Sequence, residues 1–258
     1  MEKIANIMRG PKWKPTFSTK IANERNEALE EIERENSGIQ IYMDGSAIEE
    51  GVGASAILYM NGSKRKVARK YLGPSYEHTV FKAELMGAIM GIKMLMHENA
   101  HSYTISTDNQ AAITTTHEEK GISGQYLVQA LHRQAEVLKA AQHESQLVIR
   151  WVPGHEGIEG NERADTEAKE AARNRGSREE DVLTELQGTL PVSKVAENLQ
   201  QHNELHKKAK RDFTTSLRAH NTLKIHPSMP SLAYYKMTRE KSRQHTSLMV
   251  HYGQDTCN

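Results

Sequence analysis

Cysteine is almost absent from this sequence, because the only one, Cys257, lies next to the C-terminus. A single cysteine cannot form an internal disulfide, and it cannot build a cysteine-based zinc site within the chain. Disulfide-stapled scaffolds and cysteine-caged zinc modules are therefore excluded. We expect an intracellular location, nuclear or cytoplasmic, because thiols stay reduced in those compartments.

Long apolar segments are also missing. No apolar run approaches the roughly 20 residues needed to cross a bilayer, and no apolar stretch follows a basic start at the N-terminus. We therefore expect a soluble protein that is not secreted and has no membrane partner.

Net charge is nearly zero, because 34 lysines and arginines face 33 aspartates and glutamates. Any contact with nucleic acid must therefore come from local patches of charge. Five cations gather on one predicted strand: Lys64, Arg65, Lys66, Arg69 and Lys70. Such a run more often keeps a sheet edge from aggregating than it tracks phosphates, so we favour the edge interpretation.

The order of the periodic segments predicts an α/β fold. Alternation of apolar and polar residues indicates strands, and a turn signal at Asn61-Gly62 joins two of them, whereas a helical apolar stripe begins at Phe81. The predicted elements are strands at 39–44, 51–60 and 64–72, a helix at 81–96, a strand at 102–107, helical segments at 111–119 and 124–142, a strand at 146–152 and a helix capped by Asn161 that runs to about Arg173.

Composition divides the chain into four parts. We expect a polar, partly helical lead-in at 1–37, a core domain at 38–175, a polar linker at 176–190 and a mostly helical, basic tail at 191–258. His202 and His206 share a face of the predicted tail helix. They lack an acidic or cysteine companion at metalloprotease spacing, so we favour a solvated helix over a zinc site.

Four carboxylates stand where α/β proteins place ligands or catalytic groups: Asp44, Glu84, Asp108 and Asp165. Asp44 and Asp108 are predicted to end strands, and the other two lie on predicted helices. A single acid is usually a solvated surface charge or a helix cap. Four converging acids, however, cannot all be ionised without strong repulsion unless hard cations compensate them. Magnesium suits oxygen ligands, and two ions would clamp the attacking and leaving oxygens of a phosphodiester.

Four short runs around these acids resemble the signature of type 1 ribonuclease H, in the right order. They are YMDGS at 42–46, AEL at 83–85, STDN at 106–109 and WVPGHEGIEGNERAD at 151–165. The resemblance covers residues 38–175, and its last run is the most specific. It implies a ribonuclease H-like fold: a five-stranded mixed sheet, three antiparallel strands followed by two parallel ones, with helices on both faces.

The resemblance also implies the chemistry, which is hydrolysis of the RNA strand of an RNA/DNA hybrid by a two-metal-ion mechanism. The catalytic, metal-binding carboxylates would be Asp44, Glu84, Asp108 and Asp165, holding two Mg²⁺ ions for which Mn²⁺ is expected to substitute. In the family, the histidine matching His155 assists proton transfer and product or metal release. Imidazole suits that role because it ordinarily exchanges a proton close to neutral pH, whereas a lone loop histidine is usually just solvated.

Residues next to the acids are candidates for substrate contact: Gly45, Ser46, Asn109 and Gln110. A glycine lets the backbone approach a ligand closely, and a hydroxyl or amide next to it can bond the 2′-OH that distinguishes RNA from DNA. Helix capping is an equally good interpretation of Asn109 and Gln110.

The chain departs from the family pattern at residues 117–121, which read HEEKG. Many cellular members carry a basic helix and loop there that grips the hybrid. We therefore expect weak, salt-sensitive binding and a possible need for a reverse transcriptase domain as partner. The lead-in at 13–17 and the helix predicted at 191–223 look like the surroundings of ribonuclease H domains in fungal non-LTR retrotransposon polyproteins.

Two other functions fit the same fold. A catalytically silent hybrid-binding module would keep the architecture after losing productive metal geometry, but the four intact acids argue against decay. A DNA-directed nuclease or integrase relative is disfavoured by the glycine-flanked loop of His155.

Overall fold

The structure is a computed structural model that describes residues 1–4, 13–35, 37–117, 121–173 and 179–214. The chain divides into two compact units, Met1–Glu197 and Asn198–Asn258. The strands are β1 (Ser18–Lys20), β2 (Ile39–Ile48), β3 (Gly51–Met60), β4 (Ser63–Pro74), β5 (Ser102–Thr107) and β6 (Gln146–Trp151). The helices are α1 (Arg25–Glu33), α2 (Val80–Leu95), α3 (Gln110–Thr115), α4 (Gln125–Ala141), α5 (Glu159–Ala172) and α6 (Lys194–Thr214).

The first unit is built on one sheet with the strand order β1-β6-β5-β2-β3-β4. Strands β2, β3 and β4 pair antiparallel, and β5 and β6 continue the sheet in parallel, which confirms the predicted mixed sheet. The sheet has six strands rather than five, because β1 pairs in parallel with β6. Three residues are too few to show a period, so the sequence pattern gave no signal for β1.

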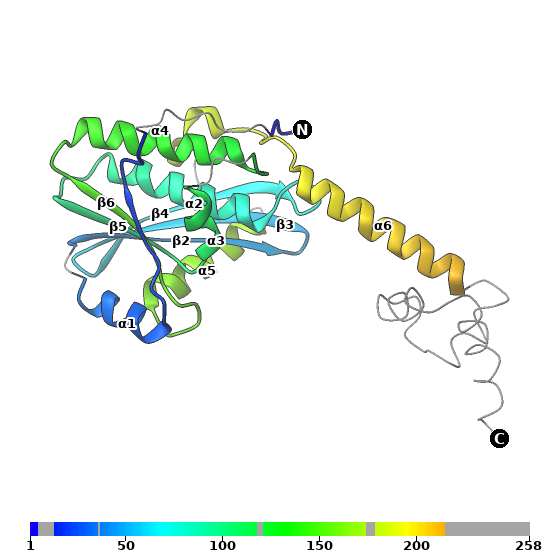
Figure 1. Cartoon of the computed structure of the whole chain (residues 1–258), viewed down its shortest axis with the longest axis horizontal. Coiled ribbons are helices and arrows are strands. Elements are labelled where there is room, and N and C mark those ends of the chain that lie inside the picture. Colours follow the sequence, from blue (N-terminus) through cyan, green and yellow to red (C-terminus); the bar gives the residue numbers. More distant parts are fainter. Residues whose placement is uncertain (5–12, 36, 118–120, 174–178, 215–258) are drawn as a thin grey trace, which may run out of the picture. The chain divides into compact units, whose positions relative to one another are not determined.

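Helices cover both faces of this sheet, as predicted. Figure 1 shows α2 and α4 on one face, and α1 and α5 on the other. Almost every residue of α2 is buried, because this helix is enclosed between the sheet and α4.

Glycines allow α2 to lie very close to β2. A Cβ atom added at Gly45 would sit 2.6 Å from the backbone nitrogen of Glu84, and one added at Gly91 would sit 2.9 Å from Cγ2 of Ile41. Real Cβ atoms do not approach other atoms to within 3.0 Å, so a larger residue would force the helix outward. This close packing fixes α2 beside the strand that carries Asp44.

On the opposite face, α5 lies directly on β3. A Cβ atom at Gly53 would sit 2.1 Å from the backbone nitrogen of Ala172. The Ser55 hydroxyl donates a hydrogen bond to the Ala164 carbonyl at 2.7 Å, which fixes the other half of the helix. The helix that carries Asp165 is thereby held against the centre of the sheet.

The segments flanking the core domain also contribute to the first unit. Phe17, in the predicted lead-in, is buried and stacks on the His132 ring with a centroid distance of 5.2 Å. In the predicted linker, Val182, Leu186 and Leu190 are buried in the main hydrophobic cluster. The polar composition of 176–190 gave no sign of these three buried side chains. At least residues 182–190 pack against the core and do not form an exposed linker.

In the predicted tail, the structure describes one helix, α6, and the rest of the predicted helix to 223 lies outside the described residues, as does the end of the chain. From Gln201 to Asp212 every residue of α6 is exposed. No helix among the described residues combines the length and the apolar character required to span a bilayer.

Candidate metal centre

Three of the four predicted carboxylates converge at one point of the first unit. Asp44, Glu84 and Asp108 each offer an oxygen atom, and these atoms all lie within 4.8 Å of one another. Asp44 is 8% exposed and Glu84 is 2% exposed, whereas Asp108 is half-buried. The group is therefore a compact acidic cluster at the border between the core and the solvent.

The end of the parallel pairing between β2 and β5 brings the two aspartates together. The last register pair of these strands is Tyr42 with Ser106, and Asp44 and Asp108 each follow two residues later. The prediction that Asp44 ends its strand is wrong, because β2 continues to Ile48 while paired only with β3. The alternation of apolar and polar residues stops at Gly45, which suggested the end of the strand. A glycine is needed there because α2 packs closely against it.

Glu84 enters the cluster from the second turn of α2. The helix begins after Thr79, whose hydroxyl accepts a hydrogen bond from the Lys82 backbone N–H at 3.4 Å. Thr107, the last residue of β5, donates its hydroxyl to the Glu84 carboxylate at 3.2 Å. Sequence reasoning did not single out Thr107, although its place immediately before Asp108 is the only signal available.

Asp108 is held from two further elements. Its backbone carbonyl accepts a hydrogen bond from the Trp151 indole at 3.1 Å, and its carboxylate accepts one from the Asn161 amide at 3.5 Å. The prediction that Asn161 caps the last helix is wrong, because α5 begins two residues earlier, after Ile158. Asn161 is a buried residue of the first turn, and its spacing of four from Asp165 places both on one helix face.

Asp165 does not join the three-acid cluster. Its side chain is 35% exposed and forms an ion pair with Lys169 at 2.7 Å, one turn further along α5. It is nevertheless close enough for its charge to raise the pKa of Asp44. The fourth predicted acid therefore lies at the periphery of the cluster, with a counterion of its own.

Burial and mutual repulsion oppose ionisation of the cluster. Burial, followed by the charges of Asp108 and Asp165, raises the pKa of Asp44 to about 7. Burial, followed by the charges of Asp44 and Asp108, raises the pKa of Glu84 well above its ordinary value. Among the described residues, none of the three acids forms an ion pair. Clustered carboxylate oxygens without a counterion are the donor set that a hard divalent cation fits.

His155 lies on the loop between β6 and α5, directly after Gly154, where an added Cβ atom would sit 2.8 Å from the Asp108 carboxylate. It is exposed and has a φ of 59°, and the Gly157 that follows has a φ of 71°. The neighbouring Glu156 is tied to Arg25 by an ion pair at 2.7 Å. The loop therefore presents the imidazole to solvent.

The predicted substrate-contact residues occupy different environments. Gly45 packs against α2, and the Asn109 side chain caps α3 by accepting from the Ala112 backbone N–H at 3.0 Å. Ser46 is half-buried, and Gln110 is an exposed residue at the start of α3. Asn109 is therefore a helix cap through its side-chain carbonyl oxygen. Ser46 and Gln110 keep polar side-chain groups that a ligand can reach.

The raised pKa of Asp44 makes a prediction for the protein without metal. The folded state binds this proton more tightly than the unfolded chain, so the contribution of Asp44 to stability falls as pH rises from about 4 to about 7. Asp44→Asn removes the charge, so the free energy of unfolding of the variant should exceed that of the wild type by more at pH 8 than at pH 5. About two pH units separate pH 5 from the folded pKa of about 7, and one unit corresponds to about 1.4 kcal/mol, so the advantage of the variant should grow by on the order of 2 to 3 kcal/mol between pH 5 and pH 8.

Urea denaturation in the presence of chelator measures this difference. Glu136→Gln, which neutralises an exposed acid on α4, is the matched control and should behave like the wild type at both pH values. An Asp44→Asn variant with the same stability difference at pH 5 and pH 8 would contradict the electrostatic account of the cluster.

Comparison with known proteins gives matches both to a related sequence and to solved structures. The Pol polyprotein of equine infectious anemia virus (strain Wyoming) is 29% identical over 158 residues, which cover 61% of this chain but only 12% of that polyprotein. Among solved structures, the N-terminal RNase H domain of a Mycobacterium tuberculosis protein, fused to maltose-binding protein, is 19% identical over 54% of this chain and 96% of its own, with a TM-score of 0.42. LC11-RNase H1 in complex with an RNA/DNA hybrid is 20% identical over 53% of this chain and 97% of its own, also with a TM-score of 0.42.

The family model for RNase H matches residues 36–173, which are just over half of the chain. That range contains β2 to β6, α2 to α5, and every residue of the acidic cluster. The chain therefore belongs to the RNase H family of nucleases.

Proposed function

We propose that this chain hydrolyses the RNA strand of RNA/DNA hybrids with two magnesium ions at Asp44, Glu84, Asp108 and Asp165. The observation that carries the proposal is the convergence of three carboxylates within 4.8 Å, two of them buried, with no ion pair among the described residues. Such a group is electrostatically unfavourable alone and becomes favourable around a divalent cation.

Magnesium is the ion that this donor set favours, because all its candidate ligands are oxygens. When bound, the two ions would compensate the charge of the phosphodiester and activate the attacking water. Asp44 and Glu84 would give up protons as they become ligands, because burial and repulsion keep their pKa values high in the metal-free protein. Asp165 would exchange its ion pair with Lys169 for a place at the edge of the metal centre.

His155 assists in proton transfer and in the release of product. Its exposed position on a loop beside α5 leaves the imidazole accessible to substrate and solvent. Imidazole is the side chain best suited to pass protons near neutral pH.

Ser46 and Gln110 contact the 2′-OH groups of the RNA strand and so distinguish RNA from DNA. Ser46 stands two residues after Asp44 on β2, and Gln110 stands two residues after Asp108 at the start of α3. Ser46 is half-buried and Gln110 is exposed, so both side chains are accessible. Gly45 and Asn109 help to position these two residues. Gly45 lets α2 pack closely against β2, and Asn109 caps the start of α3.

The domain originates from a retrotransposon polyprotein, of the fungal non-LTR kind, in which a reverse transcriptase domain is its partner. The likeness to a retroviral Pol polyprotein supports a link to reverse transcription. The finer assignment rests on the residues around 13–17 and on the helix after Pro191.

Cleavage of labelled RNA tests this function directly. We expect cutting of the RNA strand in a hybrid, but not in double-stranded or single-stranded RNA, at low salt with Mg²⁺, and complete loss with chelator. Asp108→Asn should reduce the rate by at least about 100-fold while leaving the fold intact, because it removes one charged group at the reacting centre with little change in volume. Circular dichroism checks the fold.

Glu136→Gln again serves as the control and should retain full activity. Full activity in Asp108→Asn would overturn the metal assignment. Intact hybrid binding by the wild type without any cutting would favour a catalytically silent module.

His155→Ala tests the proposed role of the loop. Turnover should slow by roughly 10- to 100-fold without being abolished, because the acidic cluster remains. If the imidazole assists product release, the multiple-turnover rate should fall further than the single-turnover rate, both measured by rapid quench. An unchanged multiple-turnover rate would show that His155 is only a solvated loop residue.

A further inference from the structure

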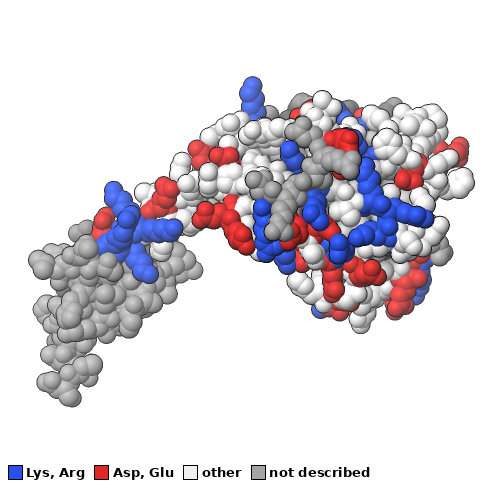
Figure 2. Space-filling view, turned by 180° about the vertical axis from the view of Figure 1, so that it is seen from behind, with Lys and Arg blue, Asp and Glu red and all other residues white. Residues whose placement is uncertain are grey.

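Several cations of the first unit are bound to acids of the same unit. Arg69 and Arg163 both pair with the buried Glu167, and Lys169 pairs with Asp165. Arg25 likewise pairs with Glu156. Figure 2 shows basic and acidic side chains side by side over this unit. The paired cations are therefore less available to the phosphates of a nucleic acid.

Several lysines of the first unit are engaged in another way. Lys82 donates to the Pro191 carbonyl at 2.6 Å, and Lys93 donates to the Val182 carbonyl at 2.8 Å. Lys139 likewise donates to the Ser145 carbonyl at 2.8 Å. These ammonium groups hold the fold together and are committed to backbone acceptors.

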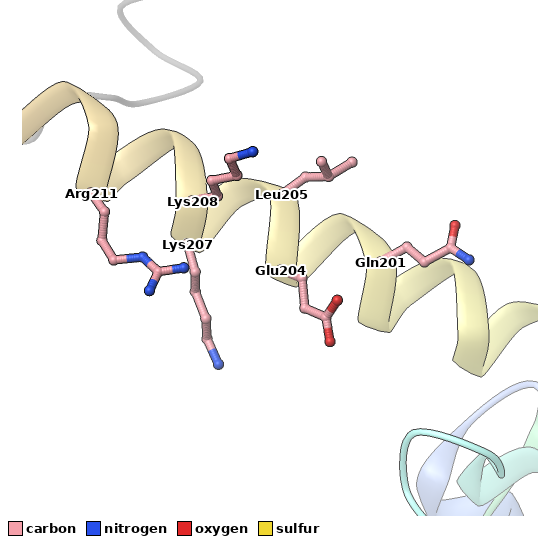
Figure 3. A pocket seen from close by; sticks show the side chains of 6 residues that line it. All are labelled: Gln201, Glu204, Leu205, Lys207, Lys208 and Arg211. Carbon is pink, nitrogen blue, oxygen red and sulfur yellow. The ribbon is translucent and has the colours of Figure 1, made fainter.

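The end of α6 is different. Four cations follow within five residues, and we call them the basic end of α6: Lys207, Lys208, Lys210 and Arg211. All are exposed, and Figures 2 and 3 show basic side chains gathered on this part of the helix. Within the described residues, Lys207, Lys208 and Lys210 form no ion pair. Glu204, the acid best spaced to neutralise Lys208, instead accepts from Gln200 at 3.0 Å.

Exposed and unpaired ammonium groups are the groups that exchange water for phosphate at low cost. Helical spacing places Lys207 and Arg211 one turn apart, and Figure 3 shows both on the same side of the helix as Glu204, with Lys208 on the other side. Each ammonium that neutralises a phosphate of a duplex releases a condensed counterion, which favours binding. The flexible lysine stems can follow a regular row of phosphates without reading bases.

We infer that the basic end of α6 binds the phosphate backbone of the RNA/DNA hybrid and adds affinity to that of the first unit. This inference rests on the proposed function. Covalent attachment of the helix raises the effective concentration of a bound hybrid near the chain, with no requirement for a fixed orientation. The connection at 117–121 contains a single lysine, so affinity from this helix would compensate for the missing basic loop.

The test is a full-length triple variant, Lys207→Gln, Lys208→Gln and Lys210→Gln. Glutamine keeps a helix propensity close to that of lysine, so circular dichroism should be unchanged. Hybrid binding is measured by fluorescence anisotropy with chelator, so that the hybrid stays intact. At about 0.1 M salt we expect binding at least about tenfold weaker, and a salt slope reduced by roughly two to three, since each lost phosphate contact lowers it by about one.

A second triple variant matches the loss of charge: Arg34→Gln, Arg133→Gln and Arg173→Gln. These arginines are paired with Glu30, Glu185 and Glu49. Binding by this variant should stay within about twofold of the wild type, because charge alone is not the determinant. Equal losses in the two variants, or no loss in the lysine variant, would overturn the assignment of the basic end of α6.

Cleavage by the same proteins separates this inference from the proposed function. At saturating hybrid, low salt and with Mg²⁺, the lysine variant should cut at the wild-type rate, because no catalytic group has changed. A wild type that binds hybrid but never cuts it would refute the proposed function and leave this inference standing. Weaker binding to acidic lipid vesicles, with unchanged hybrid binding, would instead assign the helix to a membrane surface and refute the inference.

Discussion

The repulsion among three carboxylates is the constraint on which the rest of the site depends. Asp44, Glu84 and Asp108 come from three different elements, and nothing in their local sequence requires them to meet. The fold brings them together because glycines admit α2 against β2, and because β2 and β5 leave their shared ladder at the same level. The hydrophobic core between the sheet and α2 stabilises an arrangement that the acids themselves oppose.

Repulsion among the three acids links the stability of the fold to metal binding. Burial and neighbouring acids raise the pKa values of Asp44 and Glu84, so both stay protonated to higher pH than ordinary carboxyl groups. A divalent cation that binds there displaces these protons. Other charges of the first unit neutralise one another, as Arg69 and Arg163 do with Glu167. The lysines at the basic end of α6 form no ion pair within the described residues, and we propose that they add to the affinity for the hybrid.

The mixed sheet, the helices on both faces and the three central acids followed from the sequence, because periodic burial and the short motifs around the acids leave signals within short windows. The rest depended on contacts between distant segments. β1 is three residues long and exists only because β6 offers an edge, and Leu186 is buried only because the core has a surface to cover there. Asparagine is a common helix cap, yet α5 begins two residues before Asn161, and the Asn161 side-chain amide donates to Asp108. The spacing of four residues between Asp165 and Lys169 is enough to suggest their ion pair. Only the structure shows that Asp165 lies outside the three-acid cluster.

The number of protons released when Mg²⁺ binds tests the central claim most directly. Calorimetric titration in buffers of different ionisation enthalpy gives this number. Because the pKa of Asp44 is about 7 and that of Glu84 is also raised, we predict release of at least about one proton per chain at pH 6, with less at higher pH. Binding of Mg²⁺ without proton release at pH 6 would contradict the account, since it would mean that the acids are already ionised or that the ion binds elsewhere.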